Sequence, residues 1–299
     1  MHHPSQRRFR LRRILAGLLA AVVAISVYSM ILAPPSRTAA PAPASAHIPA
    51  ASQTQASPGS TGSNTAAASP GIGAGLDTAI AGIISANSQY QVGVALINLN
   101  DGVLHQYGVE APFEAASTAK ILTAAAYYQQ VEAGTASLDD PLGAYTAGFQ
   151  LQEMVQDSDN DSWSLLMGAV GLSHLTAYAA SIGITYDPEA NTLSTADMAH
   201  ILAELYEGKL LNQDHTQQLL SYMQNTNYEY LIPSAVPSNV TVYHKYGLLD
   251  GELHDAAILT DGTASYVLVV YTKGADLSDV PQRTVVIQNI TRAVTAAVF

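Results

Sequence analysis

The stretch STAKILTAAAYYQQVE, residues 117–132, combines a helical pattern with a serine three positions before a lysine. This spacing places the Lys120 ammonium one helical turn from the Ser117 hydroxyl, on the same face. A helix start also supplies unpaired backbone N–H groups and the positive end of the helix dipole. A desolvated lysine can serve as base for a serine nucleophile in acyl transfer, and such N–H groups can stabilise the oxyanion. Taken alone, the stretch also fits a serine cap followed by an exposed helix lysine.

Two more polar motifs follow along the chain. Ser158-Asp159-Asn160 separates two helical segments, and it combines a hydroxyl that can relay a proton with an amide that can bind a lysine and a substrate amide. Lys245-Tyr246-Gly247 ends a predicted strand, where a positive charge lies beside a glycine that permits close backbone approach. Each has an ordinary alternative: a polar capping turn for the first, and a lysine that protects an edge strand for the second.

In the order Ser-x-x-Lys, Ser-Asp-Asn, Lys-x-Gly, the three motifs together resemble the class A β-lactamase and penicillin-binding serine hydrolase superfamily. Adjoining segments agree with the resemblance, which covers about residues 76–299. These segments are Phe113-Glu114-Ala115-Ala116, Trp163-Ser164-Leu165-Leu166 and His254-Asp255-Ala256-Ala257-Ile258.

The resemblance implies the chemical role of the first motif and its neighbours. Ser117 would be the nucleophile, and Lys120 would be the base for acylation. The backbone N–H groups of Ser117 and Leu248 would form the oxyanion hole. Asn160 would orient both Lys120 and the substrate amide.

The resemblance also implies which residues interact with the leaving nitrogen and the carboxylate of the substrate. Ser158 would pass a proton to the leaving nitrogen, and Lys245 would attract the substrate carboxylate. Tyr246 and Gly247 would contact the substrate from the same strand. No cofactor or metal is expected, and the histidines show no metal-binding spacing such as His-Glu-x-x-His.

Three departures from the family pattern bear on turnover. The usual Lys-Thr-Gly reads Lys-Tyr-Gly, so Tyr246 replaces the hydroxyl that normally meets the substrate carboxylate. The stretch before Ser158 is short, which would open one side of the cleft. The family's deacylating Glu-x-x-x-Asn is also missing, because Glu189 lies two residues before Asn191 in the short loop 183–193. Glu189 is therefore either a deacylation base or an ordinary solvated carboxylate.

The hydrophobic patterns predict an α+β fold, and the resemblance implies that this fold is β-lactamase-like. A five-stranded antiparallel sheet, built from both ends of the domain, would be flanked by terminal helices, with an all-helical subdomain inserted. The predicted strands are Gln91–Leu99, Val103–Tyr107, Thr241–Lys245, Glu252–Thr260 and Ser265–Thr272. The predicted terminal helices are Leu76–Ser88 and Val280–Val298.

The charge of the chain is divided between its two parts. Residues 1–75 hold six basic residues, all of them arginines, and no acidic residue. Residues 76–299 hold all 24 acidic residues and only six basic ones. An acidic domain of this kind is a poor nucleic-acid binder. The chain has no cysteine, which excludes disulfides and thiol nucleophiles.

The first 75 residues predict a tether. Residues 1–13 form a basic cytoplasmic segment, 14–33 an uncharged apolar run long enough to span a bilayer, and 34–75 a disordered Pro/Ala/Ser linker. The arginines orient the span so that the domain 76–299 lies outside the cytoplasm. The alternative is a cleaved signal peptide and a secreted protein.

Three functions are open at this stage. The first is a membrane-tethered, monomeric serine acyl-hydrolase of class A β-lactamase type, which attacks a β-lactam or a related cell-wall amide. The second is a D-Ala-D-Ala peptidase or slow acyl-enzyme former, because the loop 183–193 is short. The third is a catalytically silent domain that binds peptidoglycan or a partner.

Overall fold

The computed structural model describes residues 72–299. The predicted basic segment 1–13, the predicted membrane span 14–33 and the linker up to residue 71 lie outside this range and stay predictions. The first helix, α2 (Ala74–Ala86), begins two residues earlier than the predicted domain boundary, so positions 74 and 75 belong to the domain and not to the linker. Within residues 72–299, no helix combines the length and apolarity needed to cross a membrane.

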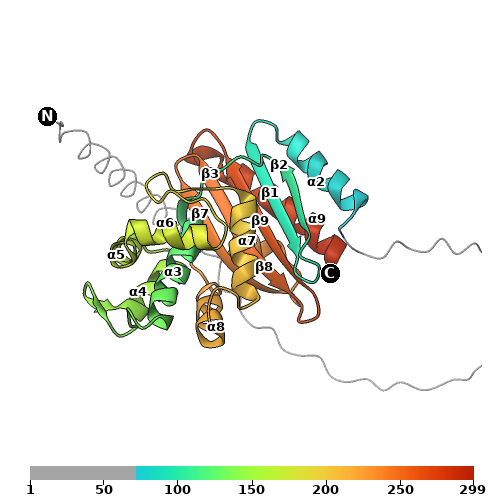
Figure 1. The fold of residues 1–299 in the computed structure, drawn as a ribbon. Coiled ribbons are helices and arrows are strands. Elements are labelled where there is room, and N and C mark those ends of the chain that lie inside the picture. Colours follow the sequence, from blue (N-terminus) through green and yellow to red (C-terminus); the bar gives the residue numbers. More distant parts are fainter. Residues whose placement is uncertain (1–71) are drawn as a thin grey trace, which may run out of the picture. The chain divides into compact units, whose positions relative to one another are not determined.

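The domain is organised around one antiparallel sheet with the strand order β2-β1-β9-β8-β7 (Figure 1). Strands from the two ends of the domain meet where β1 pairs with β9. This confirms the predicted α+β arrangement. The strands are β1 (Gln91–Asn98), β2 (Leu104–Gly108), β7 (Thr241–Leu249), β8 (Glu252–Thr260) and β9 (Ser265–Lys273).

Strand β7 differs from its prediction. The sequence pattern predicts an end at Lys245, but the strand continues through Tyr246 and Gly247 to Leu249. The reason is the tight turn at Asp250-Gly251, which lets β7 pair with β8 up to the register Leu249↔Glu252. Since β7 is the last strand of the sheet, one of its edges is left without a strand partner in the described part of the chain.

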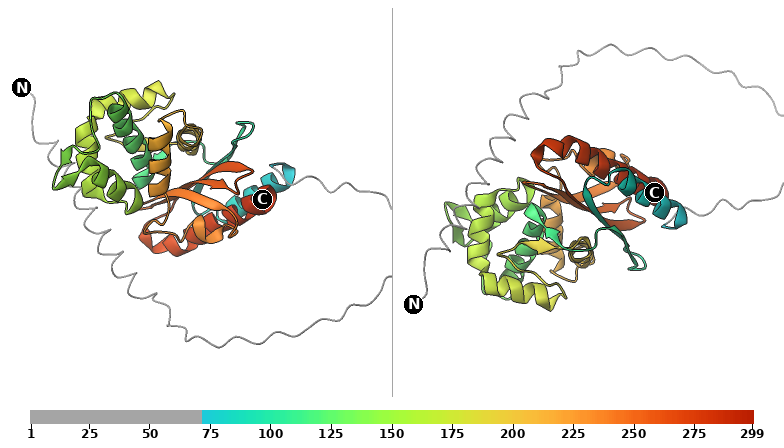
Figure 2. Two further views of the ribbon diagram at one scale, coloured as in Figure 1. Left: turned by 90° about the horizontal axis from the view of Figure 1, so that it is seen from below. Right: turned by 90° about the horizontal axis from the view of Figure 1, so that it is seen from above.

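Helices cover both faces of the sheet (Figure 2). The terminal helices α2 and α9 (Val280–Val298) pack against each other and against one face. Helix α7 (Thr195–Tyr206) lies across the other face, next to the inserted helical subdomain. The helices of that subdomain are α3 (Lys120–Glu132), α4 (Ala147–Gln156), α5 (Asn160–Val170), α6 (Leu172–Ser181) and α8 (Gln213–Tyr222).

Shorter elements connect these layers. A 3-10 turn, η1 (Ala116–Ala119), leads directly into α3, and two further turns are η2 (Pro233–Ala235) and η3 (Leu277–Asp279). The two-residue strands are β3 (Phe113–Glu114), β4 (Pro141–Leu142), β5 (Tyr145–Thr146) and β6 (Thr192–Leu193). Strand β3 pairs with β6, so the segment before η1 is held by the segment before α7.

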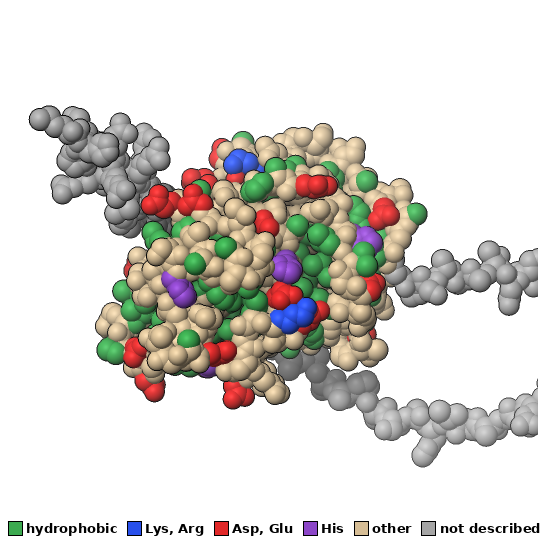
Figure 3. Space-filling model, viewed as in Figure 1, with side chains coloured by type: hydrophobic (Ala, Val, Ile, Leu, Met, Phe, Trp, Pro, Cys, Tyr) green, Lys and Arg blue, Asp and Glu red, His purple; other side chains and the backbone are tan. Residues whose placement is uncertain are grey.

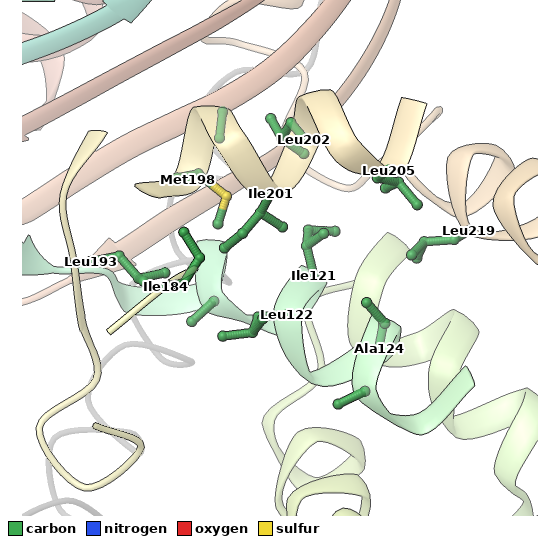
Figure 4. Packing of buried hydrophobic residues seen from close by; sticks show 14 of the residues in the cluster. Ile121, Leu122, Ala124, Ile184, Leu193, Met198, Ile201, Leu202, Leu205 and Leu219 are labelled. Carbon is green, nitrogen blue, oxygen red and sulfur yellow. The ribbon is translucent and has the colours of Figure 1, made fainter. Parts of the chain in front are cut away.

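Helix α3 is the buried centre of the helical subdomain. Its residues Ile121 and Leu122 are fully buried and belong to the same hydrophobic cluster as α7 residues such as Ile201 and Leu202 (Figure 4). Burial of each such side chain stabilises the fold by about 1.5–3 kcal/mol. Because α3 is enclosed in this way, its first residue, Lys120, is also removed from solvent.

Candidate active site

The turn that carries Ser117 is held by three side chains. His254 Nε2 lies 2.9 Å from the Glu114 carbonyl oxygen, Thr118 Oγ1 donates to the Ala115 oxygen at 2.7 Å, and Asn191 Nδ2 donates to the Ala116 oxygen at 3.1 Å. Three successive carbonyl groups before the serine are therefore fixed.

Ala116, the residue before Ser117, has a left-handed backbone with φ of +48°. A residue with a Cβ adopts this conformation at a cost of roughly 1–2 kcal/mol. The hydrogen bonds to the carbonyl groups on either side of it offset this cost. Ser117 itself is partly exposed at the start of η1, one turn before Lys120.

The Lys120 ammonium joins the first two sequence motifs. Its Nζ lies 2.6 Å from the Ser158 carbonyl oxygen, 3.2 Å from Ser158 Oγ and 2.9 Å from Asn160 Oδ1. The side chain is fully buried. Burial and the nearby charge of Lys245 lower the pKa of Lys120 well below its ordinary value, although Asp159 opposes the shift. The interpretation of Lys120 as an exposed helix lysine is therefore wrong.

The Ser-Asp-Asn loop has a distinct backbone. Ser158 has φ of +59°, which turns the chain between α4 and α5. Asp159 caps α5 by accepting a hydrogen bond from the Ser162 N–H at 2.6 Å. The cap fixes the start of α5, so Asn160 in its first turn is held against Lys120.

Lys245 lies on β7 and is fully buried. Its Nζ donates to the Tyr246 carbonyl oxygen at 3.2 Å and lies 4.1 Å from the centroid of the Tyr246 ring. Burial lowers the pKa of Lys245 to about 7, against the opposing charges of Asp255 and Asp157. The structure thus brings Lys245 near Lys120, and its charge contributes to the lowered pKa of Lys120.

The backbone of β7 approaches Ser117 at Gly247. A Cβ added there would lie 3.1 Å from the Ala115 oxygen and 3.2 Å from the Ser117 nitrogen, closer than ordinary van der Waals contact. The His244 N–H points away from β8, because it donates to the Met223 oxygen at 2.8 Å. The directions of N–H groups alternate along an antiparallel strand, so the Leu248 N–H points to the same free edge. This arrangement is compatible with the predicted oxyanion hole of Ser117 and Leu248.

The Tyr246 side chain is almost entirely buried. Only 6% of the residue is exposed, and its ring stacks on Tyr228 with 4.7 Å between centroids. Its hydroxyl donates to Asn227 Oδ1 at 2.8 Å. Burial raises the pKa of Tyr246, and hydrogen bonding to Ser158 and Asn227 opposes this increase. The phenol hydroxyl therefore lies beside Ser158.

The loop 183–193 places Glu189 at the surface. No hydrogen bond or ion pair joins its carboxylate to another residue of 72–299; only its backbone N–H is bonded, to Asp187 Oδ1 at 2.8 Å. Asp187, four residues before Asn191, is also exposed. The geometry gives a deacylating role of Glu189 no support, and that role stays a prediction.

Asn191 is a site residue to which the sequence pattern assigns no role. Besides holding Ala116, its side chain accepts a hydrogen bond from the Tyr186 hydroxyl at 2.9 Å, and its backbone oxygen accepts one from the Ala115 N–H at 2.8 Å. It also has a left-handed φ of +50°. Asparagine tolerates this conformation better than most residues, so the residue type is the one feature of the sequence that could have indicated a structural role for Asn191.

A buried ion pair between His244 on β7 and Asp255 on β8 is extended by the partly exposed Glu229. His244 Nδ1 lies 2.9 Å from Asp255 Oδ1, and His244 Nε2 lies 3.2 Å from Glu229 Oε1. Burial works against protonation, yet both carboxylates together raise the pKa of His244 to about 9. Across residues 72–299, no cluster of three or more His, Cys, Asp or Glu side chains could hold a metal ion.

Comparisons with known proteins agree with this geometry. Residues 75–298 match a family described as the Beta-lactamase enzyme family. A β-lactamase of Proteus vulgaris is 31% identical over 222 residues, which cover 62% of this chain and 82% of that protein. β-Lactamase OXY-2 of Klebsiella oxytoca is 29% identical over 219 residues, covering 60% of this chain and 76% of that protein.

Two solved structures have the same fold. The class A β-lactamase of the last common ancestor of Gram-negative bacteria (GNCA4) aligns with a TM-score of 0.68 and 26% identity, covering 75% of this chain and 99% of its own. A mutant of PBP-A, solved as an acyl-enzyme complex with penicillin G, aligns with a TM-score of 0.68 and 22% identity, covering 74% of this chain and 95% of its own. At that identity the second likeness concerns the fold alone.

Proposed function

The chain belongs to the β-lactamase enzyme family of class A-like serine hydrolases, and on this premise we propose that it opens β-lactam amides through an ester on Ser117. The observation that carries the proposal is the buried Lys120 side chain. It contacts Ser158 and Asn160 and has a lowered pKa, and it lies one turn from a partly exposed serine.

Acylation begins with a proton transfer from Ser117 to Lys120. The lowered pKa leaves a larger fraction of Lys120 as the neutral amine that can accept this proton. The Ser117 Oγ then forms a bond to the lactam carbonyl carbon, and the carbonyl oxygen becomes an oxyanion. The N–H groups of Ser117 and Leu248 stabilise that charge. The nearby charge of Lys245 helps to keep Lys120 unprotonated.

The second half of acylation breaks the C–N bond. Ser158 Oγ is 3.2 Å from the Lys120 Nζ, so it can take the proton from the Lys120 ammonium while giving its own to the leaving nitrogen. The carbonyl re-forms as the Ser117 ester, and Lys120 is neutral again. Water must later cleave this ester for the enzyme to turn over.

The exposed position of Glu189 favours a second candidate, a D-Ala-D-Ala peptidase or slow acyl-enzyme former. Without a placed base, each 1.4 kcal/mol left in the deacylation barrier slows the release of the acyl group tenfold. A silent binding domain is the third candidate.

We also propose that the domain is membrane-tethered and extracytoplasmic. Fractionation of cells that express the full chain tests this location, and recovery of the intact chain in the soluble cytoplasm would refute it.

One time course separates the three functions. The full chain is mixed with benzylpenicillin, and its intact mass is followed from milliseconds to hours, with Ser117→Ala as the control. An adduct that appears and disappears supports the β-lactamase proposal, and a persistent adduct supports the slow acyl-enzyme former. A folded chain that never gains mass refutes both.

A further inference from the structure

Tyr246 stands at the motif position whose hydroxyl, according to the resemblance, meets the substrate carboxylate. Its ring is held from one side by Tyr228, and its hydroxyl is held by Asn227 and lies beside Ser158. Ser158 is the residue proposed to face the leaving nitrogen. A group on the leaving side of the substrate therefore meets the edge of a phenol, whereas in the family pattern it meets a small hydroxyl side chain.

The ammonium of Lys245 is covered by the same residue. The Nζ lies 4.1 Å from the Tyr246 ring centroid, donates to the Tyr246 carbonyl oxygen and has no exposed surface. A carboxylate could reach this ammonium only if the ring left its stack on Tyr228. The lowered pKa of Lys245, about 7, also means that its charge is partly lost at neutral pH.

The other cations of residues 72–299 are engaged elsewhere or lie at the surface. Lys120 donates to Ser158 and Asn160, and the buried Arg283 is paired with Asp279. The buried His244 is paired with Asp255 and Glu229. The remaining basic residues form surface contacts of their own: Lys209, Lys273 and Arg292. On the face shown in Figure 3, acidic side chains are scattered and basic ones are sparse. An anionic group entering the site thus meets no free cation from residues 72–299.

We propose that Tyr246 determines the substrate class of this site by removing the need for a free carboxylate, so that the site also takes acyl donors that carry a neutral group, such as an ester or amide, at that position. The neutral group packs against the phenol edge beside Ser158 and needs no ammonium partner. This inference rests on the proposed function, because it concerns the substrate that acylates Ser117.

The test compares benzylpenicillin with its methyl ester on the full chain. The second-order rate constant for adduct formation on Ser117 is measured by rapid quench and mass spectrometry, and the carboxylate-to-ester ratio is the readout. We expect a ratio within about threefold of one for the natural chain. Tyr246→Thr, which uncovers Lys245, should raise the ratio by about tenfold or more, as expected for a hydrogen bond to a charged group. Tyr246→Phe keeps the ring and should keep the natural ratio.

Two results would overturn this inference alone: a natural chain that prefers the carboxylate tenfold, or a Tyr246→Thr variant that folds but leaves the ratio unchanged. If Tyr246→Thr does not fold, the ratio of the natural chain still tests the inference, because a tenfold preference for the carboxylate overturns it. A folded natural chain that forms no adduct with either probe would overturn the proposed function, and this inference with it.

Discussion

Gly247→Ala tests how closely the edge of the sheet must approach the nucleophile. The added Cβ would lie 3.1 Å from both the Ala115 oxygen and the Ala116 Cβ, and 3.2 Å from the Ser117 nitrogen. All three atoms belong to a turn whose carbonyl groups are already fixed by hydrogen bonds, so the turn cannot yield without losing one of them. The substitution therefore presses on the backbone N–H that is proposed to bind the oxyanion.

The size of the effect follows from this geometry. Overpacking of a dense region costs about 1–3 kcal/mol of unfolding free energy, and a shift of a few tenths of an ångström belongs at the lower end. Removing one oxyanion-hole donor slows catalysis about 10²–10³-fold, so a displaced donor should slow acylation by roughly 10–100-fold. The loss in rate should exceed what the loss in stability explains, because most of the protein stays folded.

The matched control is Gly168→Ala in α5. A Cβ at Gly168 has no atom within 4 Å, and alanine favours a helix more than glycine by about 0.5–1 kcal/mol. Acylation by benzylpenicillin and urea unfolding are measured for both variants. We expect Gly168→Ala to acylate at the natural rate with equal or higher stability. If Gly247→Ala acylates within threefold of the natural rate, the close contact with Ser117 has no catalytic importance.

Three other substitutions test the surroundings of the site. Asn191→Gly should lower the unfolding free energy by about 1–3 kcal/mol and slow acylation, because two side-chain hydrogen bonds are lost while glycine keeps the positive φ. Asn225→Gly, also at positive φ, should change neither the unfolding free energy nor the acylation rate in the same urea and acylation assays. His244→Asn should destabilise most below pH 6.5, and the protonation-dependent part of the loss, about 3 kcal/mol, should disappear as pH rises through about 9, since the folded pKa is raised above its ordinary value. Urea unfolding at pH 6, 8 and 10 checks this, and a pH-independent difference would contradict it. Lys120→Met should reduce Ser117 acylation by at least about 10²-fold at every pH, whereas a rate near that of the natural chain would exclude Lys120 as the base.

Much of the fold could be predicted because its patterns are local. Strands β8 and β9 show runs of apolar residues between Asp-Gly turns, and the order of strands and helices predicts one antiparallel sheet from both chain ends. The end of β7 could not be predicted in this way, because Tyr246-Gly247 resembles the end of a strand in isolation. Pairing across the hairpin with β8 overrides this local signal.

The contacts of Lys120 could be predicted in outline, since the order of motifs indicated that it meets Asn160. The position of Tyr246 could not, because it depends on Tyr228 and Asn227, which lie in an irregular segment without periodicity. The contact between His244 and Asp255 could have been predicted from the sequence. Once the hairpin register pairs Tyr246 with Asp255, His244 lies two residues along on the same face of β7.

The central claim is that a lysine-activated Ser117 forms the acyl-enzyme. The most direct measurement is peptide mapping of the full chain after a brief reaction with benzylpenicillin, with Ser117→Ala treated in parallel. We predict one penicilloyl group on the peptide that contains Ser117, and none on the variant. A penicilloyl group on another residue, or equal modification of the variant, would contradict this claim.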